Sequence, residues 1–134
     1  MATSIYPVLM TADVRASARY FVDTFGFETV FDSDWYVSLR LETWELALVE
    51  ATHETIPDGY RTSAAGVLLN VEVEDADRIY AQLRERPGTE FALDIRSEDF
   101  GQRHFIVVAP GGVLVDVIQP IPFTGAFAAQ SPVR

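Results

Sequence analysis

Hydrophobic positions along the chain change period several times, and these changes predict short strands and two helices. Helical spacing relates one set of apolar residues, which are Val14, Ala18, Phe21, Val22 and Phe25. Asp13 is placed to cap the start of this helix, and Gly26 to end it. Strand-like runs cover 4–10, 27–31, 35–41 and 44–50. The first part of the chain is therefore predicted to fold as β-α-β-β-β.

The same order of elements returns after a polar segment, 51–64, which has no clear period and is predicted to be a loop. Asp75 is placed to cap a second helix, which Pro87-Gly88 ends. Strands are predicted over 67–73, 90–95, 103–108 and 113–118. The two caps lie 62 positions apart, and the last strands of the two copies superpose with an offset of 69.

This repeat predicts an α+β fold made of two tandem βαβββ modules. The modules cover about 4–50 and 65–119, and a C-terminal arm covers 120–134. We expect one domain over 1–134, in which curved mixed sheets surround a concave cavity.

Composition narrows the possible partners. The 134 residues include 20 acidic and 10 basic side chains, so the net charge of −10 disfavours binding to nucleic acid. All the basic residues are arginines, which excludes Schiff-base chemistry by lysine. With no cysteine there is neither a disulfide nor a thiolate metal site. We find no signal peptide and no membrane-spanning run, and expect a cytoplasmic protein that binds no membrane.

Short motifs in the second module add a family resemblance. Asp-Phe-Gly-Gln-Arg (99–103) leads into Ala-Pro-Gly-Gly (109–112) and Val-Asp-Val-Ile (115–118). Together with the two modules, these motifs resemble the vicinal oxygen chelate superfamily over roughly residues 4 to 122. That superfamily includes glyoxalase I, extradiol dioxygenases, fosfomycin-modifying enzymes, and the bleomycin- and mitomycin-binding resistance proteins.

The resemblance implies where a metal would be held, because metal-dependent members use one side chain from the first strand and one from the last strand of each module. The corresponding residues are Tyr6, Ala47, Leu68 and Asp116. Alanine and leucine have no lone pair to donate, and a neutral phenol is a poor ligand. One remaining carboxylate does not satisfy an octahedral ion. We therefore predict that the chain holds no metal and no cofactor.

Strand alternation places a set of side chains on the concave face of the predicted sheets. Those predicted to contact a small organic ligand are Tyr6, Tyr36, Arg40, Ala47, Leu68, Asn70, Arg103, Phe105 and Asp116. Asp116 is expected either to contact the ligand or to form a bridge with Arg40 or Arg103. Asp116 and Glu45 are the candidate catalytic bases, if there is a reaction.

The other notable side chains favour structural roles. Trp44 and His104 have the parity of the core-facing positions, and we expect Trp35 to pack near the edge of a sheet. His53 is expected to be a solvated loop residue.

Three functions remain open, one of which is a structural or accessory role in a biosynthetic cluster. The first is a metal-free binding protein, similar to the resistance proteins, that sequesters an aromatic or cationic antibiotic-like molecule. The alternative is a glyoxalase-like lyase or isomerase, or a dioxygenase, with atypical or no metal ligands. In either case we expect a homodimer, because open sheets leave edges that a second subunit can cover.

Overall fold

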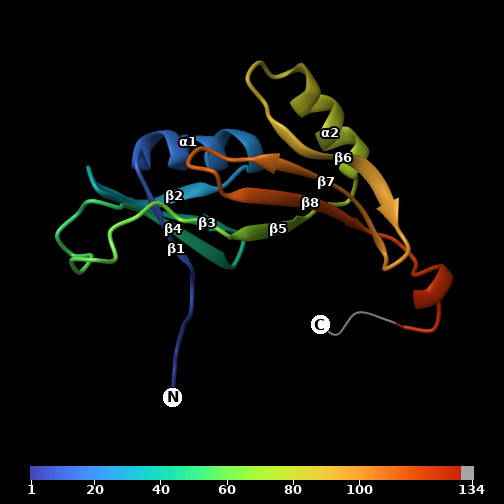
Figure 1. Ribbon diagram of the computed structural model, residues 1–134, viewed down its shortest axis with the longest axis horizontal. Coiled ribbons are helices and arrows are strands. Elements are labelled where there is room, and N and C mark those ends of the chain that lie inside the picture. The colour runs from blue at the N-terminus through green and yellow to red at the C-terminus, as the bar shows by residue number, and fades with distance from the viewer. Residues whose placement is uncertain (131–134) are drawn as a thin grey trace. The chain divides into compact units, whose positions relative to one another are not determined.

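Each half of the chain forms a four-stranded mixed sheet with one helix across one of its faces (Figure 1). A computed structural model describes residues 1–130. The chain separates into two units, of which the first holds 1–66 and 109–112 and the second holds 67–108 and the residues from 113 onward. The predicted α+β class and the two βαβββ modules are confirmed.

The first unit begins with β1 (Val8–Thr11) and α1 (Val14–Phe25). Then follow β2 (Glu28–Asp32), β3 (Tyr36–Leu41) and β4 (Trp44–Glu50). The order in the sheet is β1-β4-β3-β2, and only the β1–β4 pair is parallel. The sequence predicts that the first strand begins at residue 4, whereas β1 begins at Val8.

The second unit repeats this plan with β5 (Leu68–Glu72), α2 (Ala76–Glu85) and β6 (Phe91–Glu98). It continues with β7 (Gln102–Val108), β8 (Leu114–Pro120) and the short helix η1 (Gly125–Phe127). The sheet order is β5-β8-β7-β6, again with one parallel pair, β5–β8. β6 extends three residues beyond the predicted strand, to Glu98.

The strand registers show the repeat residue by residue. Val8 lies opposite Ala47 in the first parallel pair, and Asn70 lies opposite Asp116 in the second. Val8 and Asn70 are 62 positions apart, and Ala47 and Asp116 are 69 positions apart, which are the two offsets found in the sequence. The two sheets therefore have the same register between their first and last strands.

Two side chains cap the N-terminus of each helix. The Asp13 carboxylate accepts a hydrogen bond from the Ala16 amide at 3.0 Å, and Asp75 accepts one from Arg78 at 3.1 Å. In addition, Glu50 Oε1 accepts the Val14 amide at 2.9 Å, and Gln119 Oε1 accepts the Ala76 amide at 3.1 Å. Glu50 ends β4 and Gln119 lies near the end of β8, so each last strand is tied to the start of its module's helix.

Aromatic and branched side chains fill the space between each helix and its sheet. In the first unit, the Phe21 ring meets Phe27 edge-on at 5.7 Å, and Leu39 in β3 is fully buried. In the second unit, the Tyr80 ring lies 5.3 Å from Phe105, which is also fully buried. The helices within residues 1–130 are too short and too polar to cross a lipid bilayer.

Two tryptophan predictions have different outcomes. Trp35 packs as expected, because its ring stacks on His53 at 3.7 Å with an interplanar angle of 6°. His53 lies in the loop, as predicted, but it is half-buried by this ring and not fully solvated. The prediction that Trp44 is a core residue is wrong, since 67% of it is exposed. Trp44 has the expected parity, but it is the first residue of β4, next to the hairpin turn.

The double caps give a prediction on stability. Replacing Glu50 by Ala leaves the Val14 amide without its acceptor at the start of α1, so urea unfolding should show a loss of about 1 kcal/mol. Gln119→Ala should cost about the same at α2. The control is Glu54→Ala in the exposed loop, which should change stability by less than about 0.5 kcal/mol. Equal effects of Glu50→Ala and the control would contradict the proposed role of the cap.

Candidate functional site

The face of each sheet turned away from its helix carries most of the predicted ligand-binding residues. In the first unit, Val37 lies beside Ala18 and Val22 of α1, which identifies the helix side of β3. The alternate residues, together with their opposite partners, form what we call the first open face. It consists of Val8, Met10, Phe31, Tyr36, Ser38, Arg40, Glu45, Ala47 and Val49.

Hydroxyl groups gather on this first open face. The Tyr36 phenol lies near the Ser38 hydroxyl and near Tyr6, which precedes β1. Burial raises the pKa of Tyr36 above its ordinary value, and the neighbouring Tyr6 and Glu45 raise it further, while the Ser38 hydroxyl opposes the shift. Tyr36 is therefore a neutral hydrogen-bonding group at physiological pH.

Ala47 lies in the middle of the first open face. It is opposite Val8 on one side and Ser38 on the other, and Ser38 is in turn opposite Phe31. Ala47 is buried, whereas Tyr6, Val8 and Phe31 are 45%, 40% and 55% exposed. The face thus offers apolar and aromatic surface around a small residue.

Charged groups lie at one end of the same face. Arg40 is directly opposite Glu45, and its guanidinium lies 3.8 Å from the Glu28 carboxylate. All three side chains are largely exposed. The Arg40–Glu28 contact is a weak surface ion pair, which leaves these groups accessible to a charged ligand.

A chain of hydrogen bonds crosses the corresponding face of the second unit. His104 Nδ1 lies 2.8 Å from Asp116 Oδ1, and His104 Nε2 lies 2.7 Å from Glu98 Oε2. The side chains of Asp116 and His104 are each 7% exposed, and that of Glu98 is 17% exposed. Arg96 donates to the same Glu98 oxygen at 2.7 Å. The chain joins β6, β7 and β8.

The proton on His104 Nε2 follows from the geometry of this chain. The hydrogen bond from His104, together with Arg96, lowers the pKa of Glu98, so Glu98 is ionised and Nε2 carries a proton that it donates. On the other side of the ring, Nδ1 faces the Asp116 carboxyl group at hydrogen-bond distance, so the imidazole joins two acidic side chains.

Three sequence predictions about β7 are wrong. Arg103 and Phe105 do not lie on the open face, since Arg103 donates to Asp77 at the start of α2 at 2.7 Å and Phe105 packs against Tyr80 of α2. His104 faces the opposite way, toward Asp116. Asp116 consequently forms its bridge with His104 and with neither Arg40 nor Arg103. Phe105 is fully buried, and for Arg103 contact with a ligand stays a prediction.

Leu68 and Asn70 do lie on the face of the second sheet that carries Asp116, because they pair with Leu114 and Asp116 across the parallel strands. Leu68 is 50% exposed and Asn70 is also exposed. Their contact with a ligand, like that of Tyr6, Tyr36, Arg40 and Ala47, stays a prediction.

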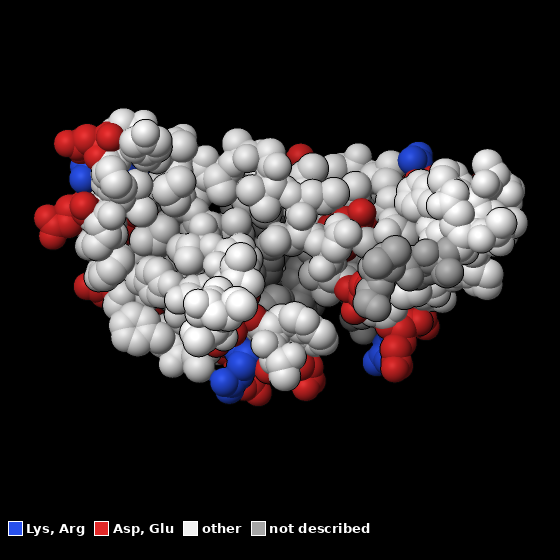
Figure 2. Space-filling model, turned by 90° about the horizontal axis from the view of Figure 1, so that it is seen from below, with Lys and Arg blue, Asp and Glu red and all other residues white. Residues whose placement is uncertain are grey.

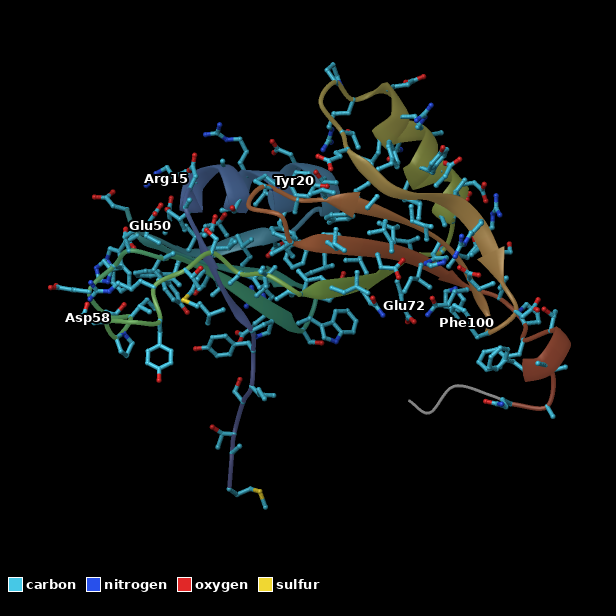
Figure 3. All side chains as sticks on the ribbon, viewed as in Figure 1. Arg15, Tyr20, Glu50, Asp58, Glu72 and Phe100 are labelled. Carbon is cyan, nitrogen blue, oxygen red and sulfur yellow. The ribbon has the colours of Figure 1, made fainter. Side chains whose placement is uncertain are left out.

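An aromatic cluster that the sequence analysis missed lies next to the hydrogen-bonded chain. Phe100, in the turn between β6 and β7 (Figure 3), meets the His104 ring edge-on at 6.5 Å and the Phe127 ring at 6.1 Å. Phe127 belongs to the C-terminal arm, whose Thr124 hydroxyl donates to Asp99 at 2.9 Å. The predicted arm is therefore ordered up to residue 130, and its last four residues lie outside the described part of the chain.

The side chains do not fit the metal that metal-dependent relatives hold. Ala47 and Leu68 have no donor atom, the Tyr6 phenol lies near Tyr36, and Asp116 is engaged with His104. The two carboxylates beside His104 lie at opposite ring nitrogens and do not converge on one point. Within residues 1–130, no group of three or more His, Asp or Glu side chains is arranged to hold an ion.

Comparison with known proteins places this geometry in a family. The model of the Glyoxalase/Bleomycin resistance protein/Dioxygenase superfamily matches residues 5–117. No protein of curated function matches the sequence.

Solved structures share the fold at low sequence identity. A protein of unknown function from Agrobacterium tumefaciens str. C58 is 22% identical, with a TM-score of 0.71 over 90% of this chain and 96% of that one. A lactoylglutathione lyase from Agrobacterium tumefaciens is 18% identical, with a TM-score of 0.71 over 88% and 94%. TnmS3, an antibiotic binding protein from Streptomyces sp. CB03234, is 22% identical, with a TM-score of 0.67 over 90% and 98%.

The hydrogen-bonded chain predicts how stability depends on pH. Because the pKa of Glu98 is lower in the folded state than in the unfolded state, its ionised form stabilises the fold above the unfolded pKa of about 4.3. This contribution is lost as the pH falls through the folded pKa. Asp77, beside Arg103, and Asp94, which accepts from the Tyr80 hydroxyl, also have lowered pKa values and act in the same direction.

Urea unfolding measured between about pH 6 and pH 2.5 checks this prediction. Stability should fall over the acidic part of this range, and the fall should be shallower in Glu98→Gln. The control variant Glu54→Gln, in the exposed loop, should keep the slope of the unaltered protein. An unchanged slope in Glu98→Gln would show that the bonds to His104 and Arg96 do not favour the ionised carboxylate.

Proposed function

Since the chain belongs to the Glyoxalase/Bleomycin resistance protein/Dioxygenase superfamily, we propose that it binds a small organic molecule on its first open face, without a metal. The observation that carries this proposal is the surrounding of Ala47. At this position metal-dependent relatives present a ligand atom, whereas here a small side chain lies between Val8 and Ser38, with the Phe31 ring on the next strand beyond Ser38. The fold is kept, and aromatic surface takes the place of metal-ligating atoms.

The side chains of the first open face suit a flat aromatic ligand. The Phe31 and Tyr36 rings lie 6.3 Å apart at an angle of 61°, so a planar guest can contact the exposed Phe31 while its polar atoms reach the Tyr36 and Ser38 hydroxyls. Glu45 and the net charge of −10 favour a guest that carries a positive charge. Figure 2 shows one side of the chain, on which acidic side chains outnumber basic ones.

An antibiotic-like ligand is the form of this proposal that the relatives suggest. TnmS3, whose fold this chain shares, is an antibiotic binding protein. Binding and sequestration require no catalytic group, and the first open face needs only shape and a few hydrogen bonds for this purpose. We therefore propose a role in resistance or self-protection.

Calorimetric titration with bleomycin, which is cationic, and with mitomycin C, which is a quinone, tests this function. We expect saturable binding of at least one compound, with the same affinity before and after dialysis against a chelator. Phe31→Ala should weaken it about threefold to tenfold, because an aromatic contact contributes about 0.5–1.5 kcal/mol. Tyr60→Ala is the matched control, since Tyr60 is 71% exposed but lies in the loop after β4.

Several results would count against the proposal. Absence of binding across both compounds and a wider set of cationic and quinone antibiotics would remove its basis. Binding that requires added Mg, Mn, Ni or Zn would show that the chain holds a metal after all. Equal weakening by Phe31→Ala and Tyr60→Ala would place the ligand elsewhere.

A second candidate function is proton transfer by a metal-free enzyme, which the buried His104–Asp116 pair favours. A carboxyl group that is hydrogen-bonded to an imidazole in a dry environment can exchange a proton with a substrate. A lyase or isomerase reaction would then depend on Asp116, or on Glu45 of the first open face. If a substrate is found, loss of turnover in Asp116→Asn would assign the base to the second sheet, and loss of turnover in Glu45→Gln would assign it to the first open face. Full turnover in both variants would exclude this function.

A further inference from the structure

A groove on the helix side of the first unit lies away from the first open face. It runs between α1 and strands β2 and β3, with a volume of about 220 Å³. Four of its residues lie one turn or less apart on α1, in one stripe along the helix: Arg15, Ala18, Arg19 and Val22. The opposite wall comes from the two strands. The groove is therefore built from regular elements and not from loops.

Apolar side chains form the bottom of the groove. Ala18 and Val37 are 8% and 3% exposed, and Val22 is half-buried between them and solvent. The small side chain of Ala18 leaves a hollow between the larger residues on either side. The volume equals roughly seven water molecules in the liquid, which is the size of a one- or two-ring organic molecule.

Two arginines border this apolar surface. Arg15 extends from the start of α1 (Figure 3), and Arg19 follows one turn later, so two like charges are neighbours on the helix, which is unfavourable. Asp32 and Asp34 lie 3.2 Å and 3.7 Å from Arg15, but all three of these side chains are at least half exposed, so the pairs are weak. Over residues 1–130, Arg19 makes no ion pair within 4.0 Å.

We propose that this groove binds a small organic anion, an aromatic monocarboxylate of one or two rings. The carboxylate accepts hydrogen bonds from the Arg19 guanidinium and shares Arg15 with Asp32, an acidic residue that also lines the groove. The ring lies on Ala18, Val22 and Val37. Arg19, with no carboxylate partner of its own among residues 1–130, favours an anion over a cation at this place, although the chain as a whole has a net charge of −10.

The proposal is independent of the function proposed above. It concerns the other face of the first sheet and a ligand of opposite charge. Loss of binding to one face leaves the other unchanged, so failure of either proposal can be recognised separately.

The experiment is a titration of ¹⁵N-labelled protein with 2-naphthoate, followed by amide chemical shifts. We expect saturable shifts centred on Ala18, Val22 and Thr29, which also lines the groove. The neutral analogue 2-naphthamide has the same rings but no charge, and should bind about tenfold more weakly because it loses charge-assisted hydrogen bonds. This pair of probes separates recognition of the carboxylate from unspecific apolar contact.

Three variants locate the site. Arg19→Gln should weaken 2-naphthoate binding about tenfold, and Ala18→Leu should abolish it by filling the hollow. Arg78→Gln removes the same charge from an exposed position on α2 and should have no effect. If Ala18→Leu does not fold, as its amide spectrum will show, Arg19→Gln and the amide analogue decide alone.

The proposal is overturned if no saturable shift appears up to roughly 10 mM 2-naphthoate. It is also overturned if 2-naphthamide binds equally well, if Arg78→Gln weakens binding as much as Arg19→Gln, or if the shifts centre on the first open face.

Discussion

Parallel pairing between the first and last strand of each module is the constraint on which the rest of the structure depends. Parallel neighbours need a crossover connection, and the helix provides it by covering one face of the sheet. Glu50 and Gln119 tie the last strand of each module to the first amide of its helix. The side covered by the helix is thereby fixed, and every alternate side chain in the four strands is assigned to the core or to the open face.

The same constraint explains how two similar sheets present different chemistry. Ala47 and Asp116 occupy equivalent positions opposite Val8 and Asn70. On the first sheet this position has no polar group, and phenols and exposed rings lie around it. On the second sheet the position holds a carboxylate, and the neighbouring strands supply His104 and Glu98. The register between the first and last strands is thus shared, while the side chains at equivalent positions have diverged.

The elements, the helix caps and the repeat could be predicted from sequence because each rests on local chemistry, such as Asp13, Gly26 and Asp75. The sequence could not predict which side chains of β7 face the helix, because this depends on whether the connection to β8 has four or five residues. A four-residue turn, 109–112, would pair Val108 with Val113 and place Phe105 beside Asp116. In the structure Val108 pairs with Leu114, so the connection has five residues and every side chain of β7 turns over. Only a turn motif of known length between β7 and β8 would have allowed the sequence to predict this register.

The environment of Asp116 follows from its burial. A carboxylate buried at this position is costly unless a positive group or a proton donor compensates it, and a metal would do so in a metal-dependent relative. Here His104 compensates Asp116, since its side chain points to the same face from the adjacent strand and is hydrogen-bonded to the carboxyl group. A second carboxylate, Glu98, holds the other ring nitrogen, and Arg96 balances its charge. The buried Asp116 carboxyl group is thus compensated by a chain of partners from β6 to β8, which explains why these side chains lie together.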